Sequence, residues 1–97
     1  MKFGLSEDNI IKIKSIFSEF PEIEEVIIFG SRAKGNYKNG SDIDLALKGS
    51  NLNLKLANSI SNKLDDLFLP YTFDLVIYSQ IENEDLIDHI DRVGVVF

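Results

Sequence analysis

The feature that most constrains this chain is a helical pattern enclosed by two strand patterns. Residues 42–47 alternate polar and apolar side chains, and residues 72–78 alternate in the same way. The segment between them predicts a helix that ends before Pro70. A connection that contains a full helix is what a parallel pair of strands requires, so we expect these two strands to be parallel neighbours. The apolar stripe of the connecting helix comprises Leu56, Ile60, Leu64, Leu67 and Phe68.

The residues before this unit predict a helix, a strand and a short helix. Apolar side chains at helical spacing favour a helix over residues 6–20, with Ser6 as its N-cap and Pro21 at its end. Residues 23–29 are rich in β-branched side chains and predict a buried strand, and residues 32–37 favour a short helix. The short connection to residues 42–47 suits an antiparallel pair.

The end of the chain predicts one more helix, followed by a short apolar tail. Ser79 is the expected N-cap, because Glu82 follows at capping-box spacing, and Gly94 is expected to end the helix before residues 95–97. We therefore predict a single α/β (α+β) domain over residues 1–97 with the element order αβαβαβα. Its sheet is expected to be mixed and three-stranded, with an antiparallel first strand and helices covering it.

Composition excludes several classes of function. The 97 residues contain no Cys and one His, His89, so thiolate metal sites, cysteine nucleophiles and histidine clusters are excluded. The net charge of −6 argues against an extended nucleic-acid surface. No segment has the length of a membrane span or the pattern of a signal peptide, so we expect a soluble cytoplasmic protein. His89 has acidic neighbours and is expected on the surface.

The charge is unevenly distributed along the chain. Residues 30–40 contain Arg32, Lys34 and Lys38 without an acidic residue, whereas the segments on both sides are acidic. Arg32 is the basic residue that we expect to contact a phosphate. One short basic, glycine-containing loop therefore lies within an acidic chain.

The expected topology brings three carboxylates to one edge of the sheet. An antiparallel first pair places Gly30 and Ser31 beside Asp42 and Asp44, and a parallel second pair brings Asp74 to the same edge. Asp42 and Asp44 share a strand face, and carboxylates about 5 Å apart repel by roughly 3 kcal/mol at an effective dielectric constant near 20. A divalent cation relieves that repulsion, and ligands that are all oxygen favour Mg²⁺ with a phosphate-bearing substrate.

The loop before the second strand offers the complementary groups for a phosphate. Gly30 lets a phosphate approach the backbone, and Ser31 and the amides that follow it offer hydrogen-bond donors. Ser41 is expected to position the turn before residues 42–47 and is also a candidate nucleotide-binding residue. Metal-binding carboxylates opposite anion-binding donors are what phosphoryl chemistry needs.

These motifs together resemble a known family. The stretches GSRAKGNYKNGSDIDLAL (residues 30–47) and FDLVIY (residues 73–78) are similar to the signature of the DNA polymerase β-type nucleotidyltransferase superfamily, in particular its minimal nucleotidyltransferases. The resemblance covers essentially the whole chain. The matching positions are Gly30, Ser31, Ala33, Gly35, Ser41, Asp42, Asp44 and Asp74.

The resemblance implies roles for these residues. Asp42 and Asp44 would bind two Mg²⁺ ions around the triphosphate of ATP, and Asp74 would bind the catalytic ion and help to deprotonate the attacking hydroxyl. Gly30 and Ser31 would hold the β and γ phosphates. The fold and the catalytic set that the resemblance implies are therefore those of a nucleotidyltransferase.

The resemblance also implies a partner. Similar minimal nucleotidyltransferases act as antitoxins of HEPN-domain toxins in type VII toxin–antitoxin pairs, and some transfer AMP to a toxin tyrosine. Two alternatives stay open: an antitoxin that neutralises its toxin by occlusion without catalysis, and nucleotidyl transfer to a small-molecule hydroxyl. Relatives with small-molecule acceptors have an added helical domain, so we expect the acceptor pocket here to come from a partner in a hetero-oligomer. Nucleotide preference is not indicated by any motif.

Overall fold

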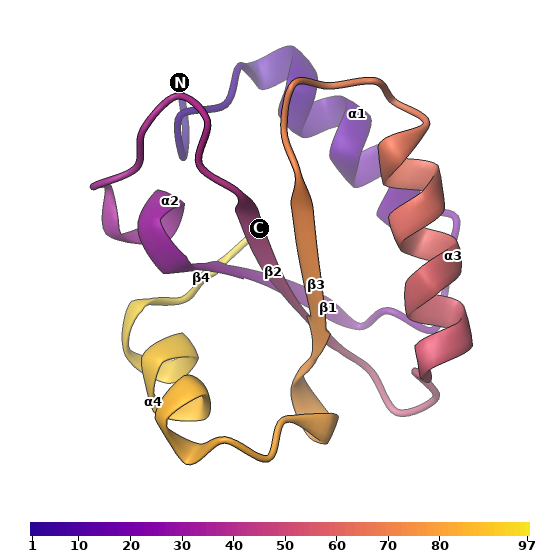
Figure 1. The fold of residues 1–97 in the computed structure, drawn as a ribbon. Helices are drawn as coiled ribbons and strands as arrows, with labels where there is room; N and C mark the ends of the chain where they lie inside the picture. The colour runs from indigo at the N-terminus through magenta and orange to yellow at the C-terminus, as the bar shows by residue number, and fades with distance from the viewer.

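Four strands form one mixed sheet that has helices on both faces (Figure 1). The computed structural model describes all residues, 1–97. The helices and strands in chain order are α1 (Glu7–Phe17), β1 (Glu25–Phe29), α2 (Gly30–Lys34), β2 (Ile43–Lys48), α3 (Leu54–Asp65), β3 (Phe73–Ile77), the 3₁₀ turn η1 (Tyr78–Gln80), α4 (Glu84–Val93) and β4 (Val95–Val96).

The strand order in the sheet is β3-β2-β1-β4. β1 is antiparallel to β2, and β2 is parallel to β3, so both predicted pairings are confirmed. The predicted number of three strands is wrong, because β4 pairs antiparallel with β1, with Val95 opposite Ile28 and Val96 opposite Ile27. Part of the expected apolar tail therefore completes the sheet on its β1 side.

Different helices pack on the two faces of the sheet. Ile43, Leu45 and Leu47 of β2 lie in the larger core cluster, which also contains buried residues of α1 and α3. Ala46 lies on the opposite face in a smaller cluster with Ile27, Phe29 and Ile90 of α4. Because side chains alternate along a strand, Asp44 points to the same face as Ala46. α4 therefore covers part of the face that carries Asp44.

Side-chain caps fix the beginnings of the three long helices. Ser6 Oγ accepts a hydrogen bond from the Asn9 N–H (3.1 Å), which confirms Ser6 as the N-cap of α1. Asn53 caps α3 in the same way. Ser79 is wrong as the N-cap of α4: it lies within η1, and the amide oxygen of Asn83 accepts from the first N–H groups of the helix. Asn83 is adjacent to the first turn, and its carbonyl oxygen is the preferred type of cap acceptor.

The helices are shorter than their apolar patterns predict. α1 ends at Phe17, before the predicted limit at residue 20, and α2 spans Gly30–Lys34 instead of residues 32–37. α3 ends at Asp65, so Phe68 is not part of a buried stripe: it is 89% exposed and adopts a left-handed backbone conformation (φ 53°). None of these helices combines the length and apolar character that crossing a membrane would take.

Candidate active site

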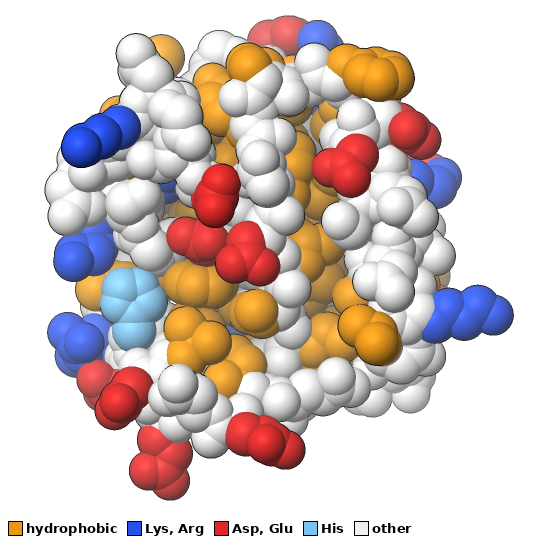
Figure 2. All heavy atoms as spheres, in the orientation of Figure 1, with side chains coloured by type: hydrophobic (Ala, Val, Ile, Leu, Met, Phe, Trp, Pro, Cys, Tyr) orange, Lys and Arg blue, Asp and Glu red, His pale blue; other side chains and the backbone are white.

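The strand register brings the predicted aspartates together at one end of the sheet. Asp44 pairs with Phe29 at the end of β1 and with Asp74 in β3, and Asp42 directly precedes β2. Figure 2 shows acidic side chains gathered over the beginnings of β2 and β3, near the only histidine of the chain. The structure therefore brings these three aspartates close together, as the sequence predicts. We call this end of the sheet, with Asp42, Asp44 and Asp74, the acidic edge.

The environment of Asp44 disfavours a negative charge. Its carboxylate is partly buried, and burial is the main cause of a pKa raised above the ordinary value of 3.8. The negative charges of Asp74 and then Asp42 raise the pKa of Asp44 further. A cation at this edge would lower the free energy of the ionised carboxylate.

The donor chemistry of the three aspartates fits Mg²⁺. All available ligand atoms are carboxylate oxygens, which suit a hard cation. No group of three His, Asp or Glu side chains is gathered closely enough to hold an ion by itself. Mg²⁺ often takes only one or two carboxylates and completes its shell with phosphate oxygens and water. The arrangement therefore fits a metal that is bound together with a phosphate-bearing substrate.

Gly30 is in close contact with Asp44. Gly30 has a positive φ of 72°, and a Cβ at this position would overlap Oδ2 of Asp44. The absence of a side chain thus allows the turn after β1 and the carboxylate to occupy adjacent space. Ser31 follows in α2, and its carbonyl accepts the Gly35 N–H (2.9 Å) at the left-handed end of that helix.

Arg32 does not lie where a phosphate ligand would. Its side chain is 2% exposed, and the guanidinium donates to the carbonyls of Phe3 (2.9 Å) and Ser41 (2.9 and 3.1 Å). The same group lies over the rings of Tyr37 and Tyr71. The prediction that Arg32 binds nucleotide is therefore corrected: its donors hold the N-terminal segment and the loop after α2 to one another.

Ser41 lies in the turn before β2, as expected. Its Oγ accepts a hydrogen bond from the Lys38 N–H (2.8 Å), and its carbonyl accepts from Arg32. The first contact is within the loop that leads to Asp42, and the second joins that loop to α2. The structure thus gives Ser41 a role in fixing the loop.

His89 is the site residue that the sequence does not predict. Its Nε2 accepts a hydrogen bond from the Gly30 N–H (3.2 Å), and its ring packs edge-on against Phe29 with the ring centroids 6.0 Å apart. His89 is partly exposed, so the expected surface position holds in part, but α4 also carries this side chain to the end of β1. No local pattern around residue 89 could indicate this contact, which joins residues 59 positions apart.

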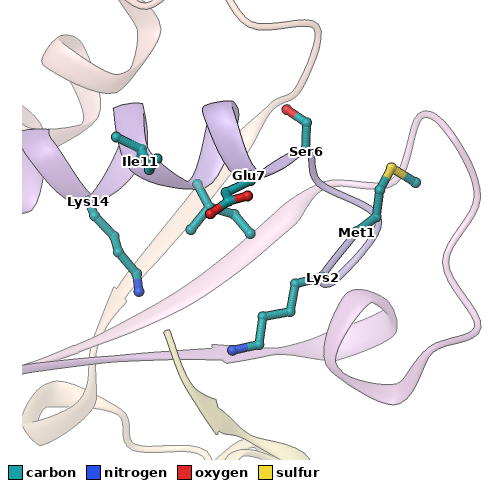
Figure 3. A pocket seen from close by; sticks show the side chains of 7 residues that line it. Met1, Lys2, Ser6, Glu7, Ile11 and Lys14 are labelled. Atoms are coloured by element: carbon teal, nitrogen blue, oxygen red, sulfur yellow. The ribbon is translucent and has the colours of Figure 1, made fainter.

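The largest surface hollow of the protein lies away from these residues. A pocket of about 600 Å³ lies between the N-terminal segment and α1, and Figure 3 shows Met1, Lys2, Glu7 and Lys14 around it. A shallower hollow of about 360 Å³ is lined by Val76 of β3, Leu86 of α4 and residues between them. Val76 lies two residues after Asp74 and on the same face of β3, but none of the three aspartates lines this second hollow.

A mixed sheet with three aspartates at one edge and a Gly-Ser turn beside them defines the nucleotidyltransferase class. The chain belongs to the polymerase β nucleotidyltransferase family, whose model matches residues 11–97.

Similar proteins include one curated relative and several solved structures. A candidate protein adenylyltransferase of Methanocaldococcus jannaschii is 32% identical in an alignment of 82 residues that covers 76% of this chain and 78% of the relative. One chain of a toxin–antitoxin complex with AMP-PNP is 25% identical, with a TM-score of 0.73 over 95% of this chain and 72% of that chain. A complex of a tri-AMPylated Shewanella oneidensis HEPN toxin with an MNT antitoxin contains a chain that is 18% identical. Its TM-score is 0.64 over 91% of this chain and 70% of that chain, which is a likeness of fold.

Proposed function

We propose that this protein is a Mg²⁺-dependent nucleotidyltransferase that transfers AMP from ATP to a tyrosine hydroxyl of a partner HEPN-domain toxin in the cytoplasm, and so acts as its antitoxin. The observation that carries the proposal is the placement of Asp44 opposite Asp74 and against Gly30. The relatives support the substrates: one is a candidate protein adenylyltransferase, and a toxin–antitoxin complex of similar fold holds AMP-PNP. The complex with the tri-AMPylated HEPN toxin supports the acceptor.

Different residues at the acidic edge would bind the phosphates and the metal ions. Ser31 would donate hydrogen bonds to the β and γ phosphates, and Gly30, which has no side chain, lets this turn lie directly against the carboxylate of Asp44. Asp42 and Asp44 would hold Mg²⁺ together with the triphosphate, and Asp74 would contribute a further carboxylate ligand. Bound Mg²⁺ supplies charge neutralisation for the triphosphate and lowers the pKa of the attacking hydroxyl.

The transfer step breaks a phosphoanhydride bond of ATP and forms a phosphoester bond to the tyrosine. The tyrosine oxygen forms a bond to the α-phosphorus of ATP, while the bond from that phosphorus to the oxygen bridging the α and β phosphates breaks. Pyrophosphate leaves with the electron pair of the broken bond. The phenolic proton passes to the carboxylate of Asp74 and from there to water. The products are a tyrosine that carries AMP, and pyrophosphate.

The test uses a double variant of the acidic edge and a matched control. Asp42→Asn with Asp44→Asn removes two of the three carboxylates, whereas Asp65→Asn with Asp66→Asn makes the same change at exposed positions at the end of α3. The full chain is incubated with ATP, Mg²⁺ and its HEPN partner, and intact mass spectrometry of the partner is the measurement. We expect the mass of AMP on the partner with wild type and with the Asp65/Asp66 control, and none with the Asp42/Asp44 variant.

Two results would contradict the proposal. One is partner labelling by a folded Asp42/Asp44 variant at the wild-type rate, because the carboxylates would then be dispensable. The other is full protection of cells against the toxin by that variant, because occlusion without catalysis would then account for the antitoxin function. Circular dichroism of each variant establishes that it is folded.

A further inference from the structure

His89 connects α4 to the turn that carries Gly30 and Ser31. It is one residue before Ile90, which is buried against the sheet, so packing of α4 fixes the place of the imidazole. We propose that His89 is a positioning residue for nucleotide binding: it holds the Gly30 amide and so sets where Ser31 meets the triphosphate. This inference rests on the proposed function.

Two contacts hold the imidazole at this turn. The Gly30 N–H donates to Nε2, so this nitrogen is the acceptor of the pair. The edge-on contact with Phe29, the residue before Gly30, fixes the plane of the ring. Both contacts act on the last residue of β1 and the first residue of α2, where the chain turns.

The beginning of α2 needs an acceptor from elsewhere. The first N–H groups of a helix have no partner within the helix, and Phe29, the N-cap of α2, offers no side-chain cap. His89 supplies that acceptor from a different helix. A hydrophobic residue at position 89 could pack on Phe29, but it could not accept this hydrogen bond.

Gly30 lies between His89 and Asp44. Its amide is held by His89, and the space where its Cβ would be is occupied by the carboxylate of Asp44. A shift of the turn therefore changes both the position of Ser31 and the space left for Asp44. Since the Gly30 N–H is already bound to His89, the phosphate donors of this turn are those of Ser31, its amide and its hydroxyl.

The test separates the hydrogen bond from the packing. His89→Ala removes both, whereas His89→Gln places an amide oxygen near the position of Nε2 and can restore the acceptor. We measure the affinity of the full chain for AMP-PNP with Mg²⁺ by calorimetry, and hydrogen exchange of the Gly30 amide by NMR. We expect His89→Ala to weaken AMP-PNP binding about tenfold, the equivalent of one hydrogen bond of roughly 1.4 kcal/mol. We expect His89→Gln to recover most of the affinity and of the Gly30 protection.

The outcomes distinguish this inference from the proposed function. Absence of AMP-PNP binding by wild type contradicts the proposed function. Wild-type binding together with unchanged affinity in His89→Ala contradicts the positioning role alone. A His89→Gln variant that folds like wild type and protects the Gly30 amide, but binds as weakly as His89→Ala, also overturns it, because restoring the hydrogen bond would then not restore the site.

Discussion

Replacing Gly30 by alanine tests the geometry of the acidic edge most directly. Gly30 has a positive φ of 72°, where an L-residue is strained, and its new Cβ would overlap Oδ2 of Asp44. Gly35 offers a matched control, because its φ is 88° and no atom lies within 4 Å of a Cβ built there. Both variants carry the backbone penalty, but only Gly30→Ala also meets the carboxylate.

The expected magnitudes follow from these two contributions. Alanine in the left-handed region costs roughly 1–2 kcal/mol, and a loss of 1 kcal/mol lowers the melting temperature of a domain of this size by about 4–8 °C. The overlap at Gly30 is relieved when the carboxylate of Asp44 rotates away, so it adds little to the loss of stability. A displacement of about 1 Å at a reacting centre can cost on the order of 100-fold in rate.

The assay pairs thermal unfolding with the rate of AMP transfer to the partner. We expect similar falls in melting temperature for Gly30→Ala and Gly35→Ala. The rate of AMP transfer should fall roughly 100-fold in Gly30→Ala and stay unchanged in Gly35→Ala. The geometric explanation is refuted if Gly30→Ala transfers AMP at the wild-type rate. It is equally refuted if Gly35→Ala loses as much rate, since the backbone penalty alone would then explain the effect.

Three further predictions concern stability. Asp44→Asn is expected to raise the melting temperature at pH 7. Folding raises the pKa of Asp44, so ionisation of this carboxylate destabilises the wild-type protein and Asp44→Asn removes that cost. The variant should therefore be no more stable than wild type below the ordinary pKa of 3.8, and its advantage should grow as the pH rises through the folded-state pKa. An advantage that does not change with pH would contradict this. Arg32→Lys should lower the free energy of unfolding in urea by about 3 kcal/mol, since charge-assisted bonds are worth roughly 1.5–3 kcal/mol each; unchanged stability with weaker nucleotide binding would restore Arg32 as a phosphate ligand. Phe68→Asn should raise the melting temperature by up to about 4–8 °C, because Asn tolerates the left-handed backbone at this exposed position; a lower melting temperature would show that Phe68 contributes packing.

Most of the sheet could be predicted because its signals are local. The alternation in residues 42–47 and the helix that follows determine the faces and the parallel pairing of β2 and β3. β4 could not be predicted in the same way. It has only two residues, which is too few for a period, and its partner β1 lies far away in the sequence.

The same difference between local signals and contacts of distant segments explains which parts of the site could be predicted. The proximity of Asp42, Asp44 and Asp74 could be predicted from the strand pattern, because the topology brings the beginnings of β2 and β3 to one edge of the sheet. Arg32 was misassigned because a basic residue in a glycine-containing loop has the same pattern whether it faces a phosphate or the carbonyls of its own chain. His89 acts through a tertiary contact, so only the packing of α4 reveals it.

The place of β1 in the sheet also bears on how the chain folds. β1 has two antiparallel neighbours, β2 close by in sequence and β4 almost at the other end of the chain. Pairings between distant segments form slowly, because closing a long loop costs entropy before any contact is made. Until β4 joins, the apolar strand around Ile27 and Ile28 has an open edge, and such edges recruit other chains. Aggregation during refolding should therefore depend on how quickly the last strand closes the sheet.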